Sequence, residues 1–397
     1  MNVPILRVMH IITRFILGGA QENTLYTVEG QHASSRHEVM LVTGPAVGPE
    51  GELLQRAEAA GINVVVTPHL VRPIHPWHDP AALVHLGALI RKFKPDVVHT
   101  HSSKAGILGR LAARLCRVPV VVHTIHGLPF HPFQSAPVNW LYILLERWCA
   151  RCSDRIITVC DAMASQALAA RVGTPRQYRT VYSGLEVDTF LRDVDREEVR
   201  RRYGLSPDDL VIGKVARLSD LKGHEYLLEA FVEVAKAEPR AKLLLVGDGW
   251  KRADYEEQVA RAGLDHRVVF AGLIPPQDVP AAVHAMDVLV HTSLREGLAR
   301  VLPQALISGV PVVSYDVDGA REVVIPGETG VLLRPKEVAG LVEAILALLA
   351  DDALRQRLGA AGRERLKETF AHTVMVARIN AVYDELLTER EGRHASG

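Results

Sequence analysis

The most informative part of the sequence is Gly213–Gly223, which reads GKVARLSDLKG. It overlaps an apolar, β-branched run at Val211–Val215, and a helix-period segment follows at Glu225–Ala237. A strand, a polar loop and a helix in this order form the repeating unit of a parallel sheet covered by helices. The loop carries Arg217 and Lys222, whose forked and point-like positive charges both suit a diphosphate. A solvated basic loop would have the same composition, so this stretch alone leaves both interpretations open.

The same alternation of strand and helix patterns runs through the rest of the second half. Further strands are predicted at Lys242–Val246, Val268–Phe270, Val288–His291, Val312–Ser314 and Val331–Leu333. Helices are predicted at Ala253–Ala262, Pro280–Ala285, Val301–Ser308 and Val338–Leu349. The charged segment Asp193–Pro207 has no strong apolar run, which is typical of a domain junction or of a first helix.

The first half repeats this organisation. Its predicted strands are Leu6–Ile12, Val39–Thr43, Val64–Thr67, Val97–Thr100, Val118–Thr124, Ile156–Val159 and Val181–Tyr182. Its predicted helices include Ala20–His32, Gly51–Ala60, Ala81–Phe93 and Ala105–Cys116. Strands that alternate with helices in this way indicate a parallel sheet with helices on both faces.

The expected fold class is therefore α/β, with two Rossmann-like doubly wound parallel-sheet domains facing across a cleft. We expect an N-terminal domain over residues 1–187 and a C-terminal domain over residues 188–371. An amphipathic helix over residues 372–390 should cross back to the first domain, and a polar, disordered tail should follow it. Ligands of such sheets bind at the carboxyl ends of the strands.

Length and composition agree with an intracellular enzyme of two domains. The 397 residues are too many for one ordinary core. No run of about 18 uncharged apolar residues occurs, so no membrane span is predicted. The apolar start of the chain is interrupted by Arg7 and Arg14, which favours a strand over a secretory signal. Cys149 and Cys152 form a CxxC in an apolar helical stretch, where buried packing is favoured over a metal or redox role.

Charge is unevenly distributed along the chain although the net charge is zero. Residues 1–187 contain 18 Lys and Arg against 12 Asp and Glu, a surplus of +6. A basic first half suits an anionic acceptor or an anionic membrane surface, and ordinary scatter of surface charge explains it equally well. The aromatic stretch Phe130–Leu145, beside Arg147 and Arg151, could dock on such a membrane or pack in the core. No nucleic-acid partner is expected.

A second informative stretch is Ser293–Ala305, SLREGLARVLPQA. A helix is predicted to begin near Ala299, so the backbone amides of Gly297–Ala299 would be donors at a helix N-terminus, which suits an anion. Glu296 stands beside them with a carboxylate that can bind sugar hydroxyls. Gln304 lies about two turns further along the helix.

Together these stretches resemble the GT-B-fold retaining glycosyltransferases of glycosyltransferase family 4, the glycosyl transferases group 1. The matching segments run in order over the whole second half: Ala216–Leu218, Lys222-Gly223, Leu245–Gly249, Val269–Gly272, Ser293–Gly297, Gly309–Val313 and Gly327–Gly330. The first half matches more loosely, through Gly18–Glu22, His126-Gly127 and Ser183-Gly184.

The resemblance implies that residues 1–187 bind the acceptor and that residues 188–371 bind the nucleotide-sugar donor, and it implies a role for each matched residue. The donor would be bound by Arg217, Lys222, Gly247, Asp248, Gly272, Leu273, Glu296, Gly297, Leu298, Ala299 and Gln304. Of these, Arg217 and Lys222 would hold the diphosphate, and Glu296 would hold the donor sugar. His126 would face the reacting centre and would share the catalytic role with these three residues.

The resemblance and the strand pattern also place residues of the first domain near the substrates. Gly18 and Gly19 would let a loop approach the donor or acceptor closely. His101 and His126 each end a predicted strand and would line the cleft. Zinc binding is disfavoured there, because no carboxylate or Cys stands at ligand spacing.

Two features concern charge at the donor site. The family usually has a second Glu where this chain has Gln304, so the donor ribose would receive neutral hydrogen bonds. Asp316 and Asp318 look like a paired-aspartate metal motif, but Arg217 and Lys222 already neutralise a diphosphate. No metal and no other cofactor is therefore expected.

The predicted function is retaining, metal-independent transfer of a sugar from a nucleotide-diphosphate donor, most simply a UDP-sugar, to a glycan or lipid-linked acceptor. Such an enzyme would work in cell-surface polysaccharide or glycoconjugate synthesis, in the cytoplasm or at the inner face of the membrane. The alternatives are a GT-B UDP-sugar 2-epimerase and a non-catalytic nucleotide-sugar binding protein. An NAD-dependent dehydrogenase is disfavoured, because no G-x-G-x-x-G follows either opening strand.

Overall fold

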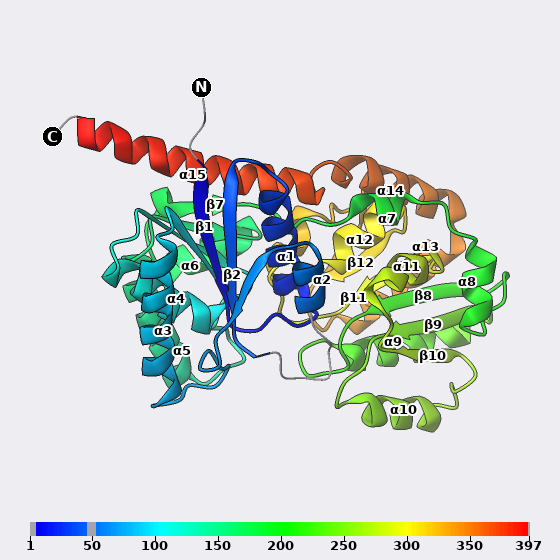
Figure 1. The fold of residues 1–397 in the computed structure, drawn as a ribbon. Helices are drawn as coiled ribbons and strands as arrows, with labels where there is room; N and C mark the ends of the chain where they lie inside the picture. The colour runs from blue at the N-terminus through cyan, green and yellow to red at the C-terminus, as the bar shows by residue number, and fades with distance from the viewer. Residues whose placement is uncertain (1–4, 46–52, 396–397) are drawn as a thin grey trace. The chain divides into compact units, whose positions relative to one another are not determined.

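The computed structural model describes residues 5–45 and 53–395. The chain forms two compact units, unit 1 (Met1–Gly184 with His372–Gly397) and unit 2 (Leu185–Ala371). Each unit is a parallel β-sheet with helices on both faces, so the expected α/β class with two doubly wound sheets is confirmed (Figure 1). The first residues of the helix predicted at Gly51–Ala60 lie outside the described residues.

Unit 1 has a seven-stranded sheet in the order β3-β2-β1-β4-β5-β6-β7. The strands are β1 (Leu6–Ile12), β2 (His37–Thr43), β3 (Asn63–Val66), β4 (Val97–His101), β5 (Val120–Ile125), β6 (Arg155–Thr158) and β7 (Tyr178–Thr180). The helices are α1 (Gly19–His32), α2 (Leu54–Ala59), α3 (His78–Phe93), α4 (Ser103–Leu115), α5 (Ala136–Ala150), α6 (Asp161–Ala169) and α15 (His372–Ala395).

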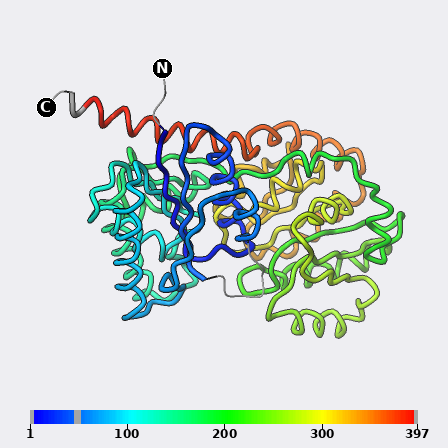
Figure 2. Tube along the Cα trace, in the orientation of Figure 1, coloured from blue at the N-terminus to red at the C-terminus, as the bar shows by residue number. Residues whose placement is uncertain are grey.

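Alternate residues of β1 enter two separate cores, as strand geometry requires. Met9 and Ile11 pack with residues of α3 and α4 on one face of the sheet. Val8 packs with Tyr26 of α1 and with residues of α15 on the other face. Figure 2 shows α15, the red end of the chain, running beside the blue β1 and α1.

Two elements of unit 1 differ from the sequence prediction. The last strand is Tyr178–Thr180 instead of Val181–Tyr182, because polar residues of β7 pair with β6 at the edge of the sheet. The helix predicted to end near residue 390 continues to Ala395, in place of a disordered tail. Its polar part is held by Arg155, which is bound to Glu385 and Glu389.

Unit 2 has a six-stranded sheet in the order β10-β9-β8-β11-β12-β13. The strands are β8 (Leu210–Val215), β9 (Ala241–Val246), β10 (Val268–Gly272), β11 (Val288–His291), β12 (Val312–Tyr315) and β13 (Gly330–Leu333). The helices are α7 (Val187–Leu191), α8 (Arg196–Arg202), α9 (His224–Ala237), α10 (Arg252–Arg261), α11 (Val279–His284), α12 (Val301–Ile307), α13 (Val338–Ala350) and α14 (Asp352–Leu366).

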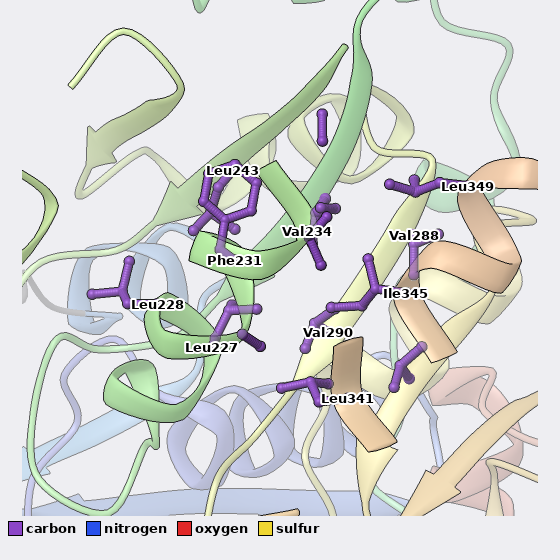
Figure 3. Close-up of a cluster of buried hydrophobic side chains, with 14 of the residues drawn as sticks. Leu227, Leu228, Phe231, Val234, Leu243, Val288, Val290, Leu341, Ile345 and Leu349 are labelled. Carbon is purple, nitrogen blue, oxygen red and sulfur yellow. The ribbon is translucent and has the colours of Figure 1, made fainter. Parts of the chain in front are cut away.

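One face of this sheet is covered by α9 and α13, whose apolar sides meet over the strands. Phe231 of α9 and Ile345 of α13 are fully buried against Leu243 of β9 and Val290 of β11 (Figure 3). The branched, apolar composition of the strands is what two buried faces demand. The core therefore fixes the strands whose ends carry the loops described below.

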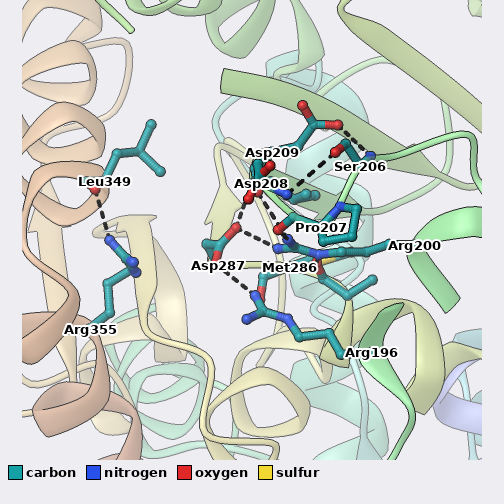
Figure 4. A network of polar contacts seen from close by, with 12 residues as sticks. Arg196, Arg200, Ser206, Pro207, Asp208, Asp209, Met286, Asp287, Leu349 and Arg355 are labelled. Carbon is teal, nitrogen blue, oxygen red and sulfur yellow. Dashed lines mark hydrogen bonds and ion pairs between the residues drawn. The ribbon is translucent and has the colours of Figure 1, made fainter. Parts of the chain in front are cut away.

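At the amino ends of β8 and β11 a buried ion network ties α8 to the sheet (Figure 4). Asp287 accepts hydrogen bonds from Arg196 and Arg200, each at 2.7 Å, and from the backbone N–H of Val211 at 2.6 Å. Arg200 also donates to the carbonyl oxygen of Ala285 at 3.0 Å. The Asp287 carboxylate thus has its ion-pair and hydrogen-bond partners within unit 2.

The cysteines fit the expected packing role. All four are free thiols, and burial raises the pKa of Cys149 to about 12, so this thiol is unreactive.

Over residues 5–45 and 53–395, no helix combines the length and the apolar character that crossing a membrane requires.

Candidate active site

In each sheet the strand order reverses between two central strands, β1 and β4 in unit 1 and β8 and β11 in unit 2. At such a reversal the helices leave the strands toward opposite faces, and the carboxyl ends of the strands open a crevice. The residues predicted from the sequence as donor ligands follow the carboxyl ends of β8, β9, β10 and β11. Arg217, Asp248, Leu273 and Glu296 therefore lie along one edge of the unit 2 sheet.

The loops at this edge are joined by hydrogen bonds. The backbone N–H of Leu218 donates to the carbonyl of Asp248 at 2.9 Å, and that of Leu294 donates to the carbonyl of Leu221 at 2.8 Å. The Thr292 hydroxyl donates to the carbonyl of Gly223 at 2.6 Å. These bonds make the loops after β8, β9 and β11 one connected platform.

Gly223 is required where this platform closes. Its φ is +66°, and a Cβ at this position would stand 2.0 Å from the carbonyl oxygen of Thr292. Only glycine tolerates both the left-handed backbone and the close approach. The glycine in the Lys222-Gly223 pair is thus a structural condition for holding Lys222 at the edge.

Glu296 is the centre of the charged cluster. Lys222 Nζ lies 2.5 Å from Glu296 Oε1, and the Glu296 backbone N–H donates to Asp318 Oδ2 at 2.7 Å. His291 Nε2 lies 3.7 Å from Glu296 Oε1, too far for a hydrogen bond but within electrostatic range. Burial alone would raise the pKa of Glu296, but the neighbouring His291 and Lys222 outweigh burial and hold this pKa well below its usual range. Glu296 is therefore an ionised carboxylate.

Two residues of this cluster were not predicted from the sequence. Lys214 of β8 is 1% exposed, and its Nζ donates to Thr292 Oγ1 at 2.9 Å. Burial, reinforced by Lys222, lowers the pKa of Lys214 to about 7. His291 of β11 is also buried, and its Nδ1 lies 3.2 Å from the Ser314 hydroxyl. A charged or polar residue inside an apolar strand run was the only sequence signal for either.

Helix α12 begins at Val301, as the Val301–Ser308 prediction has it and two residues after the alternative start near Ala299. The amides of Gly297–Ala299 therefore precede the helix. The side chains of Leu298 and Ala299 are buried. Gln304 is the fourth residue of α12 and is partly buried.

The paired aspartates already have partners in the protein. Asp316 forms an ion pair with Arg321 through both carboxylate oxygens. Asp318 accepts the backbone N–H of Glu296. These contacts make the second aspartate part of the support for Glu296.

In unit 1 the residues of interest also follow the central strands. His126 follows β5 and lines a cavity of about 280 Å³ together with Ala20, Ser102, His123 and Glu146. Gly18 is the N-terminal cap of α1 and Gly19 its first residue, directly before Ala20. The sequence-predicted Gly18, Gly19 and His126 thus belong to one region of the unit.

His101 differs from its predicted place on a cleft wall. It is fully buried, and its ring nitrogens are bonded to His10 at 3.0 Å and to His126 at 3.2 Å. The ring nitrogens of His10, His99 and His101 lie close enough together to hold a metal ion. Every one of these nitrogens is engaged in a hydrogen bond within the unit, so a metal would have to replace those bonds.

Solved structures with this architecture are GT-B glycosyltransferases. HepE from Anabaena in complex with UDP-glucose has a TM-score of 0.81 and 22% sequence identity, covering 96% of this chain and 100% of that chain. WaaG, a glycosyltransferase involved in lipopolysaccharide biosynthesis, has a TM-score of 0.73 and 16% identity, covering 94% of this chain and 99% of that chain. The fold is therefore the GT-B fold.

Family models and relatives show which protein family the chain belongs to. The model of the glycosyl transferase 4-like domain matches residues 18–184, and that of the glycosyl transferases group 1 matches residues 195–365. The 2-deoxystreptamine glucosyltransferase of Streptomyces kanamyceticus is 33% identical over 73% of this chain and 77% of its own length. UDP-Gal:alpha-D-GlcNAc-diphosphoundecaprenol alpha-1,3-galactosyltransferase of Escherichia coli is 26% identical over 97% and 98%. The chain belongs to the glycosyl transferases group 1, and it is a glycosyltransferase.

Proposed function

We propose that this enzyme moves a sugar from a UDP-sugar to a glycan or lipid-linked acceptor in cell-surface polysaccharide or glycoconjugate synthesis, with retention at the anomeric carbon. The observation that carries the proposal is the charged cluster at the carboxyl ends of β8 and β11. There Lys222 and the buried Lys214 accompany the ionised carboxylate Glu296. The complexes of HepE with UDP and UDP-glucose, and the donor named for the Escherichia coli relative, support UDP as the nucleotide.

The cluster suits a leaving diphosphate. As the bond to the anomeric carbon breaks, negative charge develops on the diphosphate, and preorganised cations stabilise it most effectively where water is excluded. Lys222 and Arg217 would supply that charge, while Glu296 would accept hydrogen bonds from sugar hydroxyls. The Lys222–Glu296 pair holds both groups in place before the donor arrives.

A carboxylate near His126 has another partner. Glu146 lines the same cavity, but it is bound to Arg110 at 2.8 Å in an ion pair that is almost fully buried. Freeing it would leave a buried charge unpaired, which is strongly unfavourable. A front-face transfer, in which the leaving diphosphate takes the acceptor proton, therefore fits unit 1 better than a covalent glycosyl-enzyme route through Glu146.

No metal is needed in this proposal. Cationic side chains take the role that a divalent ion would have at the diphosphate. Asp316 and Asp318, the residues resembling a metal motif, are bonded to Arg321 and to the Glu296 backbone.

The acceptor proposal draws on an exposed apolar stripe along α5. Trp140, Leu141, Leu144 and Trp148 recur at helical spacing, and each is at least 43% exposed. Arg147 adds positive charge on the same helix. Exposed tryptophans beside a cation are typical of a helix that lies on an anionic membrane surface, where a lipid-linked acceptor would be held.

A UDP-sugar panel tests the proposal. We expect UDP release that depends on an acceptor, survives EDTA, and is faster when a lipid-linked acceptor is presented in anionic vesicles than in detergent. The anomeric configuration of the product, read by NMR, should equal that of the donor. Epimerised sugar without acceptor would indicate the 2-epimerase, UDP binding without turnover the binding protein, and recovery with Mn²⁺ after EDTA a metal site.

A further inference from the structure

A continuous chain of side-chain hydrogen bonds crosses the interior of unit 1 and ends at His126. It starts on α15, where Asn380 Oδ1 lies 2.9 Å from Gln31 Nε2 of α1. Gln31 Oε1 lies 2.8 Å from His10 Nε2, and His10 Nδ1 lies 3.0 Å from His101 Nε2. His101 Nδ1 lies 3.2 Å from His126 Nε2.

The amide of Gln31 gives this chain a direction. Its nitrogen donates to Asn380 and also makes a side-chain hydrogen bond to Tyr383, which leaves the amide oxygen as the acceptor for His10. His10 must then carry its proton on Nε2 and accept at Nδ1. The same condition passes to His101, which donates from Nε2 and accepts from His126 at Nδ1.

The two inner histidines are neutral, so each has one donor and one acceptor nitrogen. Burial lowers the pKa of His10 to about 4 and holds the pKa of His101 well below the usual value. A protonated ring would donate from both nitrogens and break the order of the chain.

We propose that Gln31, His10 and His101 are positioning residues that fix His126 with a proton on Nε2, directed at His101 Nδ1. A hydrogen bond on one ring nitrogen orients the ring, as in other sites where a second residue positions a histidine. The His126 ring is then held in one orientation for its contact with the donor sugar. This last step rests on the proposed function, in which His126 faces the reacting centre.

Two neighbouring histidines differ from this chain because their partners include hydroxyl groups, which can donate or accept. His99 Nδ1 lies 2.5 Å from the Tyr383 hydroxyl, and its Nε2 lies 2.6 Å from the Thr124 hydroxyl. His123 Nδ1 lies 2.9 Å from the Thr100 hydroxyl and 3.1 Å from the Thr100 carbonyl oxygen. The network therefore fixes donor positions on His10, His101 and His126 but leaves both tautomers open to His99 and His123.

The first test is the tautomer itself, read by ¹⁵N NMR of the intact, histidine-labelled protein at neutral pH. We expect protonated Nε2 and unprotonated Nδ1 for His10 and His101, and a protonated Nε2 for His126. An unprotonated Nε2 on His126 would overturn the proposal, whatever the enzyme proves to transfer.

The second test uses a pair of Asn380 variants and one variant of Gln31. Asn380→Asp keeps an acceptor toward Gln31 and should retain the proton on His126 Nε2. Asn380→Leu removes the acceptor of Gln31, and Gln31→Leu removes the acceptor of His10, so both should mix the tautomers of His126. Unchanged His126 signals in a folded Gln31→Leu protein would overturn the proposal.

Turnover separates this inference from the proposed function. If both proposals hold, Gln31→Leu should lower kcat by about tenfold or more with little change in KM, and Asn380→Asp should keep most of the wild-type kcat. If the tautomer of His126 changes as expected while kcat stays at the wild-type value, the positioning chain stands and the catalytic role of His126 fails.

Discussion

The two ends of the same strands in unit 2 carry very different ion clusters. At the amino ends of β8 and β11, Asp287 is enclosed by Arg196, Arg200 and a backbone N–H, and the network is closed on itself. At the carboxyl ends, Lys222 is paired with Glu296, and the buried Lys214 donates to the Thr292 hydroxyl. Both clusters combine two cationic side chains with one paired carboxylate, but Lys214 is held by a neutral hydroxyl, whereas Arg196 and Arg200 both bind Asp287 directly.

The difference bears on which cluster stabilises the fold and which one we propose receives a ligand. Removing one member of a buried ion pair costs several kcal/mol. At the other cluster the charged form of Lys214 is disfavoured, because this amine has lost solvation and is repelled by Lys222. Binding of an anionic donor would favour the charged form of Lys214.

The largest expected effect is at the amino ends. Asp287→Ala leaves Arg200 buried without its carboxylate, so the free energy of unfolding should fall by about 3–5 kcal/mol. Chemical denaturation measures this change in the free energy of unfolding. Glu257→Ala, which removes an exposed pair with Arg261, is the control and should change stability by less than about 1 kcal/mol. Equal losses in the two variants would contradict the assignment of the Asp287 network to stability.

Smaller effects are expected at the carboxyl ends, and there on catalysis. Glu296→Gln removes the charge next to the donor sugar and should lower kcat by about tenfold with little change in KM, because that charge is used in the transition state. Steady-state rates measure this loss of kcat.

Gln304→Glu should leave UDP affinity unchanged or tighten it, since hydrogen bonds to a charged acceptor are about twice as strong. Calorimetry measures the UDP affinity of this variant. Loss of UDP binding in a folded Gln304→Glu protein would contradict placement of this residue at the ribose.

Much of this arrangement could be predicted from the sequence because it depends on local pattern. The strand and loop at Gly213–Gly223 gave both the parallel-sheet unit and the pair Arg217 and Lys222. The order of such units along the chain predicted two doubly wound sheets, since each unit returns the chain to the same edge. The prediction for the edge strand β7 was wrong because the residues of this strand are polar, and edge strands need not be apolar.

The parts that escaped depend on contacts between residues far apart in the chain. Lys214 and His291 lie on strands where a single polar residue gives no indication of its partner. The bond from Gln31 to Asn380 joins residues 349 positions apart, so no local pattern could place His101 in a buried chain instead of on a cleft wall. Only the packing of α15 against α1 brings these side chains together.

The most direct test of the central claim is the dissociation constant for UDP, measured by calorimetry on the wild type and on Lys222→Ala and Arg217→Ala. Lys242→Ala, which removes a cation from β9 of the same unit, is the matched control. UDP should bind the wild type and the Lys242→Ala control with equal affinity. Each loop variant should bind at least about tenfold more weakly, a loss of about 1.4 kcal/mol. Wild-type affinity for UDP in both Lys222→Ala and Arg217→Ala would contradict a donor site at the carboxyl ends of β8 and β11.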